Sequence, residues 1–225
     1  MDLQGEPAPE PGGLDAVAAA REEYTRGGLL ESDLLPDPIS MFRKWYDDAY
    51  AAGLHEPNAM VVATVSADFA PSARLVLLKG VSGDGFVFYT NTGSRKGAEL
   101  AGNPRCALLF PWHPLERQVR VDGTAAALGR EAVDAYFAVR PRGSQLGAWA
   151  SHQSHVVSGR DELQAAYDEA ERRFAHGDVP TPEEWGGYLV HPESVEFWQG
   201  RPGRMHDRLV YRRTAEGWRT ERLAP

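Results

Sequence analysis

The chain has 225 residues and a formal net charge of −8, which suits a single domain with appendages and argues against a general nucleic-acid-binding protein. Its one cysteine, Cys106, excludes an intrachain disulfide and is typical of the reducing cytoplasm. No apolar run is long enough to cross a bilayer, and the acidic start has no secretory signal. We therefore expect a cytoplasmic protein with no membrane and no nucleic-acid partner.

The first part of the chain is predicted to be helical after a disordered start. Residues 1–15 are acidic and rich in proline and glycine, which is typical of a disordered tail. Residues 16–225 are expected to form one domain. Residues 14–28 have a helical composition, and residues 37–54 carry apolar side chains at near-helical spacing.

Short β-rich runs separated by turn signals dominate the rest of the chain. Nine such runs are predicted at residues 59–66, 72–80, 85–91, 105–112, 117–128, 186–192, 194–200, 207–213 and 217–225. Helices are predicted at residues 94–103, 129–141 and 159–177. The pattern indicates a mostly β protein with peripheral helices (α+β), built on an antiparallel, barrel-like sheet. Neither G-x-G-x-x-G after a strand nor a P-loop occurs, so the common nucleotide-binding folds lack their fingerprints.

The loop Gly93–Gly97 is a candidate anion site because it leads into a predicted helix. A helix N-terminus offers unpaired N–H groups and a positive dipole end. Ser94, Arg95 and Lys96 add a hydroxyl group and two cations. A capped surface helix with basic side chains would have the same sequence, and the motif alone slightly favours that second interpretation.

A second candidate site follows the predicted helix at residues 129–141. Tyr136 and Arg140 are four residues apart and would share a helix face. Ser144 lies just beyond the proline that ends this helix, and the three side chains together would make a phosphate clamp. Residues 153–154, a glutamine and a serine, close the segment. The alternative is a helix–turn–helix with satisfied caps.

Two strands carry further polar side chains. Arg74 and Lys79 flank an apolar run and are five residues apart, so regular alternation places them on opposite faces of a strand. They should not serve one ligand unless a bulge intervenes. Gln118 and Arg120 alternate with valines and give one polar face, which is either solvated or the wall of a site.

The stretch "GRMHDRLVY" at residues 203–211 places three basic groups close together. In a regular strand Arg204, His206 and Arg208 would share one face, because side chains alternate. Spacing alone favours a solvated edge strand, on which charges prevent aggregation. Trp198 precedes the stretch, so an aromatic wall beside an anionic ligand is the alternative.

These blocks, read in order, resemble one known family. The segments "RLVLLKG", "FVFYTNTGSRKGAEL", "NPRCALLFPWHPLERQVRVDG", "RPRGSQLGAWASHQS", "WGGYLVHPESVEFWQG" and "RMHDRLVY" are similar to those of the pyridoxine/pyridoxamine 5′-phosphate oxidases. The resemblance runs from about residue 21 to residue 225. It implies an FMN-binding split barrel that forms a homodimer, with the flavin sites at the subunit interface. The seven histidines are scattered without a metal-binding motif, so no metal is expected.

The resemblance also implies a role for individual residues. The expected FMN-binding residues are Arg74, Leu75, Val76, Leu77, Leu78, Lys79, Tyr89, Thr90, Arg95, Lys96, Gln118, Gln153, Ser154, Trp198 and Arg208. The expected substrate-binding residues are Arg21, Tyr24, Lys79, Tyr136, Arg140, Ser144, Arg204 and His206. Of these, Arg204 and His206 are the expected catalytic pair beside the pyridine ring. Arg21 and Tyr24 would belong to a lid segment at residues 16–35.

The implied activity is the oxidation of pyridoxine 5′-phosphate and pyridoxamine 5′-phosphate to pyridoxal 5′-phosphate, by hydride transfer to FMN and with oxygen as acceptor. Hydrogen peroxide is the expected product, with ammonia from the amine. Glu22, Glu56 and His155 depart from the usual family pattern, and Glu22 could alter the electrostatics of the lid. Two other classes stay open: a split-barrel reductase that uses another substrate or a deazaflavin, and a non-catalytic carrier of pyridoxal phosphate.

Overall fold

The computed structural model describes residues 23–225, so the predicted tail at 1–15 and Arg21 of the predicted lid lie outside the described residues. Nine strands form one antiparallel sheet: β1 (Ala59–Val65), β2 (Pro71–Leu77), β3 (Gly80–Ser82), β4 (Gly85–Asn91), β5 (Arg105–Trp112), β6 (Arg117–Ala127), β7 (Trp185–Gln199), β8 (Asp207–Thr214) and β9 (Gly217–Arg222). The strand order is β2-β1-β5-β6-β7-β4-β3, and β8 joins β7 and β9. The predicted mostly β, antiparallel fold with peripheral helices is confirmed.

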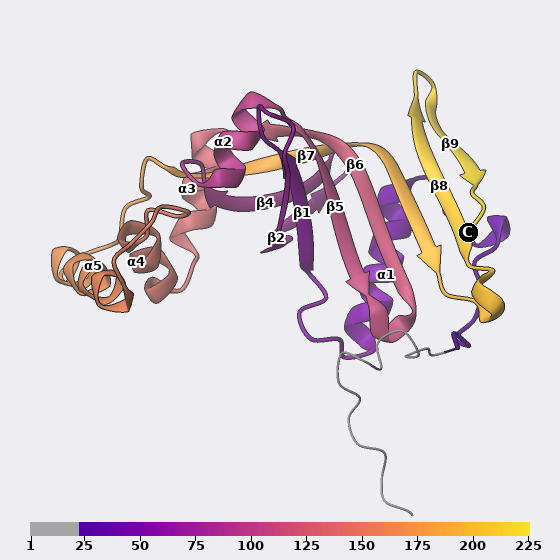
Figure 1. Ribbon diagram of the computed structural model, residues 1–225, viewed down its shortest axis with the longest axis horizontal. Coiled ribbons are helices and arrows are strands. Elements are labelled where there is room, and N and C mark those ends of the chain that lie inside the picture. The colour runs from indigo at the N-terminus through magenta and orange to yellow at the C-terminus, as the bar shows by residue number, and fades with distance from the viewer. Residues whose placement is uncertain (1–22) are drawn as a thin grey trace, which may run out of the picture.

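The helices lie behind the sheet or toward one end of it (Figure 1). The α-helices of the described residues are α1 (Pro38–Ala51), α2 (Arg95–Gly102), α3 (Arg130–Ala138), α4 (Arg142–Ala150) and α5 (Arg160–Arg173). Short 3-10 turns occur at Glu31–Asp33, His113–Leu115 and Pro202–Arg204. In Figure 1, α4 and α5 lie at one end of the molecule, whereas β8, β9 and the C-terminus lie at the other.

The long strand β7 connects the two ends of the fold. Its first half pairs with β4, its second half pairs with β8, and β6 runs along both halves. The sequence predicted two separate runs here, whereas the structure has one continuous strand. The register shifts between Asp122 and Gly123, and a Cβ at Gly123 would lie 2.3 Å from the carbonyl oxygen of His191. This irregularity lets one strand change neighbours without ending, because a bulge bends a strand and increases its twist.

The core is aromatic and lies between α1 and the sheet. Asp37 caps α1 by accepting hydrogen bonds from the backbone N–H groups of Ile39 and Ser40. The helix then buries one face, on which Phe42 contacts Phe86 and Phe110 edge to face at 4.9 and 4.7 Å. Buried rings of this size contribute a large share of the hydrophobic stabilisation of a domain. They hold the sheet rigidly behind the site.

Two local expectations were wrong. Residues 23–28 of the predicted first helix are not helical in the structure. The run at residues 72–80 is two strands, because the chain leaves β2 after Leu77 and enters β3 at Gly80. Helix α4 corresponds to the second helix of the helix–turn–helix that the sequence left as an alternative, although Gly143 and Gly147 weaken its helical signal. It forms because packing against α5 buries Leu146.

Cys106 is 8% exposed, and burial raises the pKa of its thiol to about 12, so this thiol is structural rather than nucleophilic. No helix within residues 23–225 is both long and apolar enough to cross a membrane.

Candidate functional site

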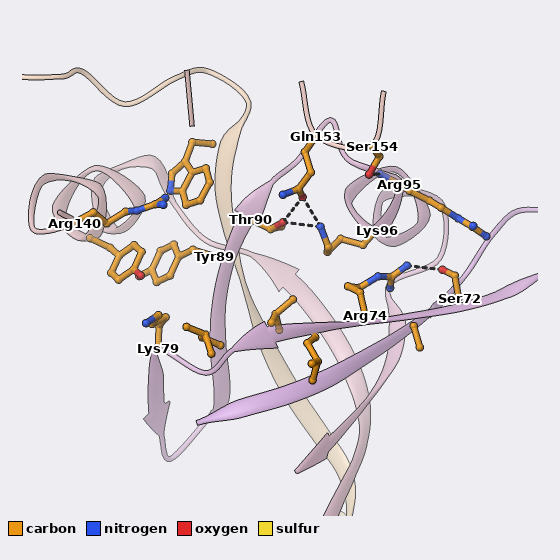
Figure 2. Close-up of a pocket in the computed structure, with 16 residues that line it drawn as sticks. Ser72, Arg74, Lys79, Tyr89, Thr90, Arg95, Lys96, Arg140, Gln153 and Ser154 are labelled. Carbon is orange, nitrogen blue, oxygen red and sulfur yellow. Dashed lines mark hydrogen bonds between the residues drawn. The ribbon is translucent and has the colours of Figure 1, made fainter. Parts of the chain in front are cut away.

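A cavity of about 610 Å³ opens between β2, β4 and the helices α2 and α3. Figure 2 shows this cavity with its lining side chains. The residues that line it are Ser72, Ala73, Arg74, Leu75, Val76, Leu77, Lys79, Tyr89, Thr90, Arg95, Lys96, Tyr136, Arg140, Gln153, Ser154 and Trp185. Five of these side chains are cationic and none is a carboxylate. Such a cavity suits a ligand that carries more than one negative charge.

One end of the cavity is built on the N-terminus of α2. Ser94 caps this helix by accepting a hydrogen bond from the Gly97 backbone N–H group, as its position in the sequence predicts. Gly97 is required for close packing, since a Cβ there would lie 2.1 Å from the Thr92 carbonyl oxygen. Arg95 and Lys96 follow directly, and the backbone N–H of Arg95 donates to Ser154 Oγ at 3.2 Å. The anion-site interpretation of this loop is therefore the one that agrees with its position in the cavity.

Lys96 is buried and already surrounded by acceptors. Its Nζ donates to Gln153 Oε1 at 2.5 Å, Thr90 Oγ1 at 3.0 Å and Ser94 Oγ at 3.1 Å. Figure 2 shows Lys96, Thr90 and Gln153 joined in this way. Burial, together with the nearby charge of Arg74, lowers the pKa of Lys96 from 10.5 to about 8. An anion placed beside Lys96 would reverse this shift.

Glu99, whose role no sequence pattern indicated, organises the cations from behind the cavity wall. Its carboxylate is 6% exposed and accepts from Ser72 Oγ at 2.6 Å, from Arg95 Nε at 2.8 Å and from Arg74 Nη2 at 3.3 Å. Burial alone would raise the pKa of Glu99, but hydrogen bonds from Ser72, Thr64 and Arg95 lower it to about 2. Glu99 thus stays charged and holds two arginines in fixed positions.

The other end of the cavity is aromatic. The rings of Tyr89 and Tyr136 stack at 3.8 Å, and the Arg140 guanidinium lies 3.9 Å from the centre of the Trp185 ring. Arg140 Nη2 donates to the Ser144 carbonyl oxygen at 3.1 Å. Arg140 Nη1 and Trp185 Nε1 are buried without a hydrogen-bond partner among the described residues. Buried donors of this kind are normally paired, so both are ready to meet an acceptor.

Tyr136 and Arg140 line the same cavity, but not for the predicted reason. Tyr136 lies in α3, whereas Arg140 lies beyond the end of that helix, so the two do not share a helix face. Lys79 lines the same cavity as Arg74, because the chain turns between β2 and β3. The opposite-face argument was therefore wrong. Ser144 lines an adjoining cavity of about 300 Å³ that shares Arg140, Gln153 and Trp185 with the main one.

Leu78 and six other predicted site residues lie away from the main cavity. Leu78 is buried in the core, 7% exposed. We call the rest the C-terminal group: Tyr24, Gln118, Trp198, Arg204, His206 and Arg208. Its centre is aromatic, since the His206 ring lies 4.6 Å from that of Trp198 and 5.6 Å from that of Tyr24. Gln118 and Arg208 are register partners of Trp198 in β6 and β8.

Arg204 and His206 do not belong to a strand. Gly203 and Arg204 have φ angles of 63° and 62°, so the backbone is left-handed before β8 begins at Asp207. The prediction that Arg204, His206 and Arg208 share one strand face was therefore wrong. Arg208 instead forms a two-point ion pair with Glu196, at 2.7 and 3.1 Å. Hydrogen bonding to Glu196 raises the pKa of Arg208.

Asp207 anchors an N-terminal segment. Its carboxylate accepts from the Leu29 backbone N–H at 3.0 Å and from Arg222 Nη1 at 2.6 Å. Arg222 also pairs with Glu31. We call residues 24–31 the N-terminal strap, and these contacts hold it against β8 and β9. The strap in turn places Tyr24 beside His206.

The cavity and the C-terminal group lie at opposite ends of β7. Trp185 lines the cavity and Trp198 lies thirteen residues further along the strand, a path of about 40 Å at roughly 3.3 Å per residue. Figure 1 shows α3 and β8 correspondingly far apart. A small ligand cannot touch both regions of the same chain.

No group of three or more His, Cys, Asp or Glu side chains within residues 23–225 is arranged to hold a metal ion. The acceptors of the cavity are instead hydroxyl and amide groups paired with its cations. These side chains are suited to binding phosphate directly.

Solved structures show the class of protein that this fold and site define. PhzG from Burkholderia lata, solved with tetrahydrophenazine-1-carboxylic acid, is 30% identical and superposes with a TM-score of 0.83 over 88% of this chain and 98% of its own. A pyridoxamine 5′-phosphate oxidase-related, FMN-binding protein from Nostoc punctiforme shares the fold at 15% identity, with a TM-score of 0.67 over 85% of this chain and all of its own. The molecule is a split-barrel protein with a cationic cavity.

Sequence comparisons identify the family within this class. Residues 46–174 match the family model described as pyridoxamine 5′-phosphate oxidase, and residues 185–225 match the pyridoxine 5′-phosphate oxidase C-terminal dimerisation region. The pyridoxine/pyridoxamine 5′-phosphate oxidase of Nocardioides sp. is 70% identical over 95% of this chain and 100% of its own. That of Rubrobacter xylanophilus is 59% identical over 93% and 96%. The chain belongs to the pyridoxine/pyridoxamine 5′-phosphate oxidase family.

Proposed function

We propose that the protein oxidises pyridoxine 5′-phosphate and pyridoxamine 5′-phosphate to pyridoxal 5′-phosphate, as an FMN-dependent oxidase (EC 1.4.3.5) of vitamin B6 synthesis and salvage. One observation carries the proposal: a single cavity has cations at both ends, with Arg74, Arg95 and Lys96 at one and Lys79 and Arg140 at the other. Glu99 reduces the formal charge of these five cations to +4. Two phosphate groups of about −2 each would neutralise that charge.

FMN fits the end of the cavity at α2. A phosphate at a helix N-terminus meets free N–H groups and the positive end of the dipole. Arg74, Arg95 and Lys96 would hold that phosphate, with Ser154 beside them. The edge of β2 at residues 75–77 would run along the flavin ring. Tyr89, Thr90 and Gln153 would complete the contacts from this chain.

The substrate phosphate fits the other end. Arg140 is half-buried and its Nη1 has no hydrogen-bond partner within residues 23–225, so this nitrogen can donate to a phosphate oxygen without giving up another bond. Lys79, Tyr136 and Ser144 would supply the remaining cation and hydroxyl groups. The stacked rings of Tyr89 and Tyr136 fix the hydroxyl of Tyr136 in place.

A second copy of the chain would supply the C-terminal group. Residues 185–225 match a dimerisation region, and in one chain this group lies a long way from the cavity. In a homodimer, Gln118, Trp198 and Arg208 would meet the flavin at the interface. Arg204 and His206 would meet the pyridine ring, and Tyr24 would cover it.

The chemistry proposed for this site divides between cofactor and protein. FMN, when bound, would accept a hydride equivalent from substrate C4′ and pass the electrons to oxygen, giving hydrogen peroxide, and water would release ammonia from the oxidised amine. The protein's part is mainly positioning. The two phosphate sites fix the ends of the reacting pair, and the aromatic surfaces of Trp198 and Tyr24 exclude water from the substrate ring.

The decisive experiment is a coupled assay on the purified, FMN-loaded protein. Addition of pyridoxamine 5′-phosphate should release hydrogen peroxide and pyridoxal 5′-phosphate, whereas unphosphorylated pyridoxamine should give at least about tenfold less at the same concentration, because it lacks the charged contact to Arg140. A yellow protein that releases no peroxide would be a reductase or a related flavoprotein. A colourless protein that binds pyridoxal phosphate would be a carrier. Either result would contradict the proposal.

A further inference from the structure

His206 is held by a backbone group rather than by a carboxylate. Its Nδ1 is 3.1 Å from the backbone nitrogen of Arg201, which has only an N–H to offer and is therefore the donor. Nδ1 must then be the acceptor. In a neutral imidazole one nitrogen is protonated and the other is not, so the proton of His206 lies on Nε2.

This arrangement is the reverse of a hydrolase triad. There a carboxylate accepts from Nδ1–H, which leaves Nε2 free to take a proton from the substrate. The carboxylate next to His206, that of Asp207, is not available for this purpose. It is occupied by the Leu29 N–H and by Arg222, and Arg201 Nε lies 3.5 Å from it.

The surroundings keep the ring in this orientation. Trp198 packs on it at 4.6 Å and Tyr24 meets it edge to face at 5.6 Å. A half-turn of the ring would replace Nδ1 with a carbon and leave the Arg201 N–H without its acceptor. Addition of a second proton, on Nδ1, would place two N–H groups against each other.

We propose that His206 acts toward the substrate as a hydrogen-bond donor through Nε2–H, and not as the base that removes a proton. It would bind an oxygen or nitrogen acceptor next to the reacting carbon and stabilise negative charge there. This inference rests on the proposed function for the identity of the substrate. The position of the proton on His206 does not depend on it.

Nitrogen-15 NMR of the flavin-loaded protein with labelled histidine tests the position of the proton directly. The signals of His206 are identified by their loss in His206→Gln. We expect a protonated Nε2 and an unprotonated Nδ1 at neutral pH. A proton on Nδ1, or on both nitrogens, would overturn the inference, and this result stands whether or not the protein oxidises pyridoxamine phosphate.

A pair of variants tests the role. His206→Gln keeps an N–H donor of similar reach but cannot act as a base, whereas His206→Leu keeps neither property. If His206 is a donor, the kcat of His206→Gln should lie within about threefold of the wild-type value. The kcat of His206→Leu should be about tenfold to a hundredfold lower than that of the wild type. If His206 is the base, both variants should lose a similar factor, of about a hundredfold or more. Equal losses, or no loss in either variant, would refute the donor role.

Flavin content per chain and the midpoint of urea unfolding confirm that each variant is folded before its rate is compared. Wild-type protein that forms no peroxide would contradict the proposed function alone, because the NMR assignment would still decide the position of the proton.

Discussion

At the residue scale, Lys96 combines burial with a proposed role in anion binding. Its pKa is lowered to about 8 because desolvation disfavours the charged form. A phosphate beside it favours the charged form, so binding should take up a proton when the pH is above the pKa of the free protein. We expect the affinity for FMN to fall as the pH rises from 7.5 to 9.5, and fluorescence titration of the flavin measures it.

Two variants separate this effect from a general loss of charge. Lys96→Met should bind FMN more weakly at pH 7 and should lose the part of the pH dependence that begins near 8. Lys44→Met, which removes an exposed lysine of α1, should keep the wild-type profile. An unchanged profile in Lys96→Met would show that another group titrates.

The lowered pKa of Glu99 leads to a prediction about the free energy of unfolding, also at the residue scale. Its pKa is about 2 in the folded protein and 4.5 in the reference state, so its stabilising contribution is present above pH 4.5 and is lost as the pH falls toward 2. Glu99→Gln should lower the free energy of unfolding at pH 7 by about 1–3 kcal/mol, as expected for lost hydrogen bonds to a charged group. Urea unfolding of the flavin-free protein should show this difference narrowing at pH 3. If the difference in free energy of unfolding between the two proteins is the same at pH 7 and pH 3, the shape of the Glu99 side chain, not its charge, stabilises the fold.

At the element scale, the sequence predicted features that depend on adjacent residues, but not those that depend on residues far apart in the chain. The cap at Ser94 and the helix after it were predictable because a few adjacent residues determine them. Glu99 was not, because its importance arises from side chains on β1, β2 and α2 that meet only in the fold. The face argument for Arg204 and His206 was wrong because the left-handed backbone at Gly203 precedes the strand.

The packing of the N-terminal strap against Gly200 leads to a prediction at the element scale. Tyr24 can pack beside Gly200 only because this residue has no side chain, since a Cβ there would lie 2.7 Å from the Tyr24 ring. Gly200→Ala should therefore displace Tyr24 from Trp198 and His206. We expect a KM for pyridoxamine 5′-phosphate raised about tenfold, as for the loss of one well-packed contact, with normal flavin content.

Gly102→Ala is the matched control, because a Cβ at that position meets nothing within 4 Å. Its KM should equal that of the wild type. A Gly200→Ala protein with an unchanged KM would show that Tyr24 does not cover the substrate. This result would contradict the proposed role of the strap as a lid.

At the scale of the whole molecule, the cavity and the C-terminal group lie far apart in one chain. This separation determines whether a chain mutated in one region can complement a chain mutated in the other. Arg140→Ala damages the cavity and leaves the C-terminal group intact, whereas His206→Leu does the reverse. If each site combines the cavity of one chain with the C-terminal group of the other, a mixed dimer has one site with both defects and one with neither. Equal chains that assemble at random form mixed dimers half of the time, so the mixture should recover about a quarter of the wild-type activity.

The chains must be mixed by co-expression or by unfolding and refolding together, because preformed dimers exchange slowly when their interface is large. The activity of each variant prepared alone gives the baseline. The activity of the double variant co-expressed with wild type gives the reference for a mixed dimer that carries both defects in one chain. If each site lies within a single chain, every site in the mixture carries one defect and activity stays at the baseline. Recovery to about a quarter would therefore establish that the substrate is held between two chains.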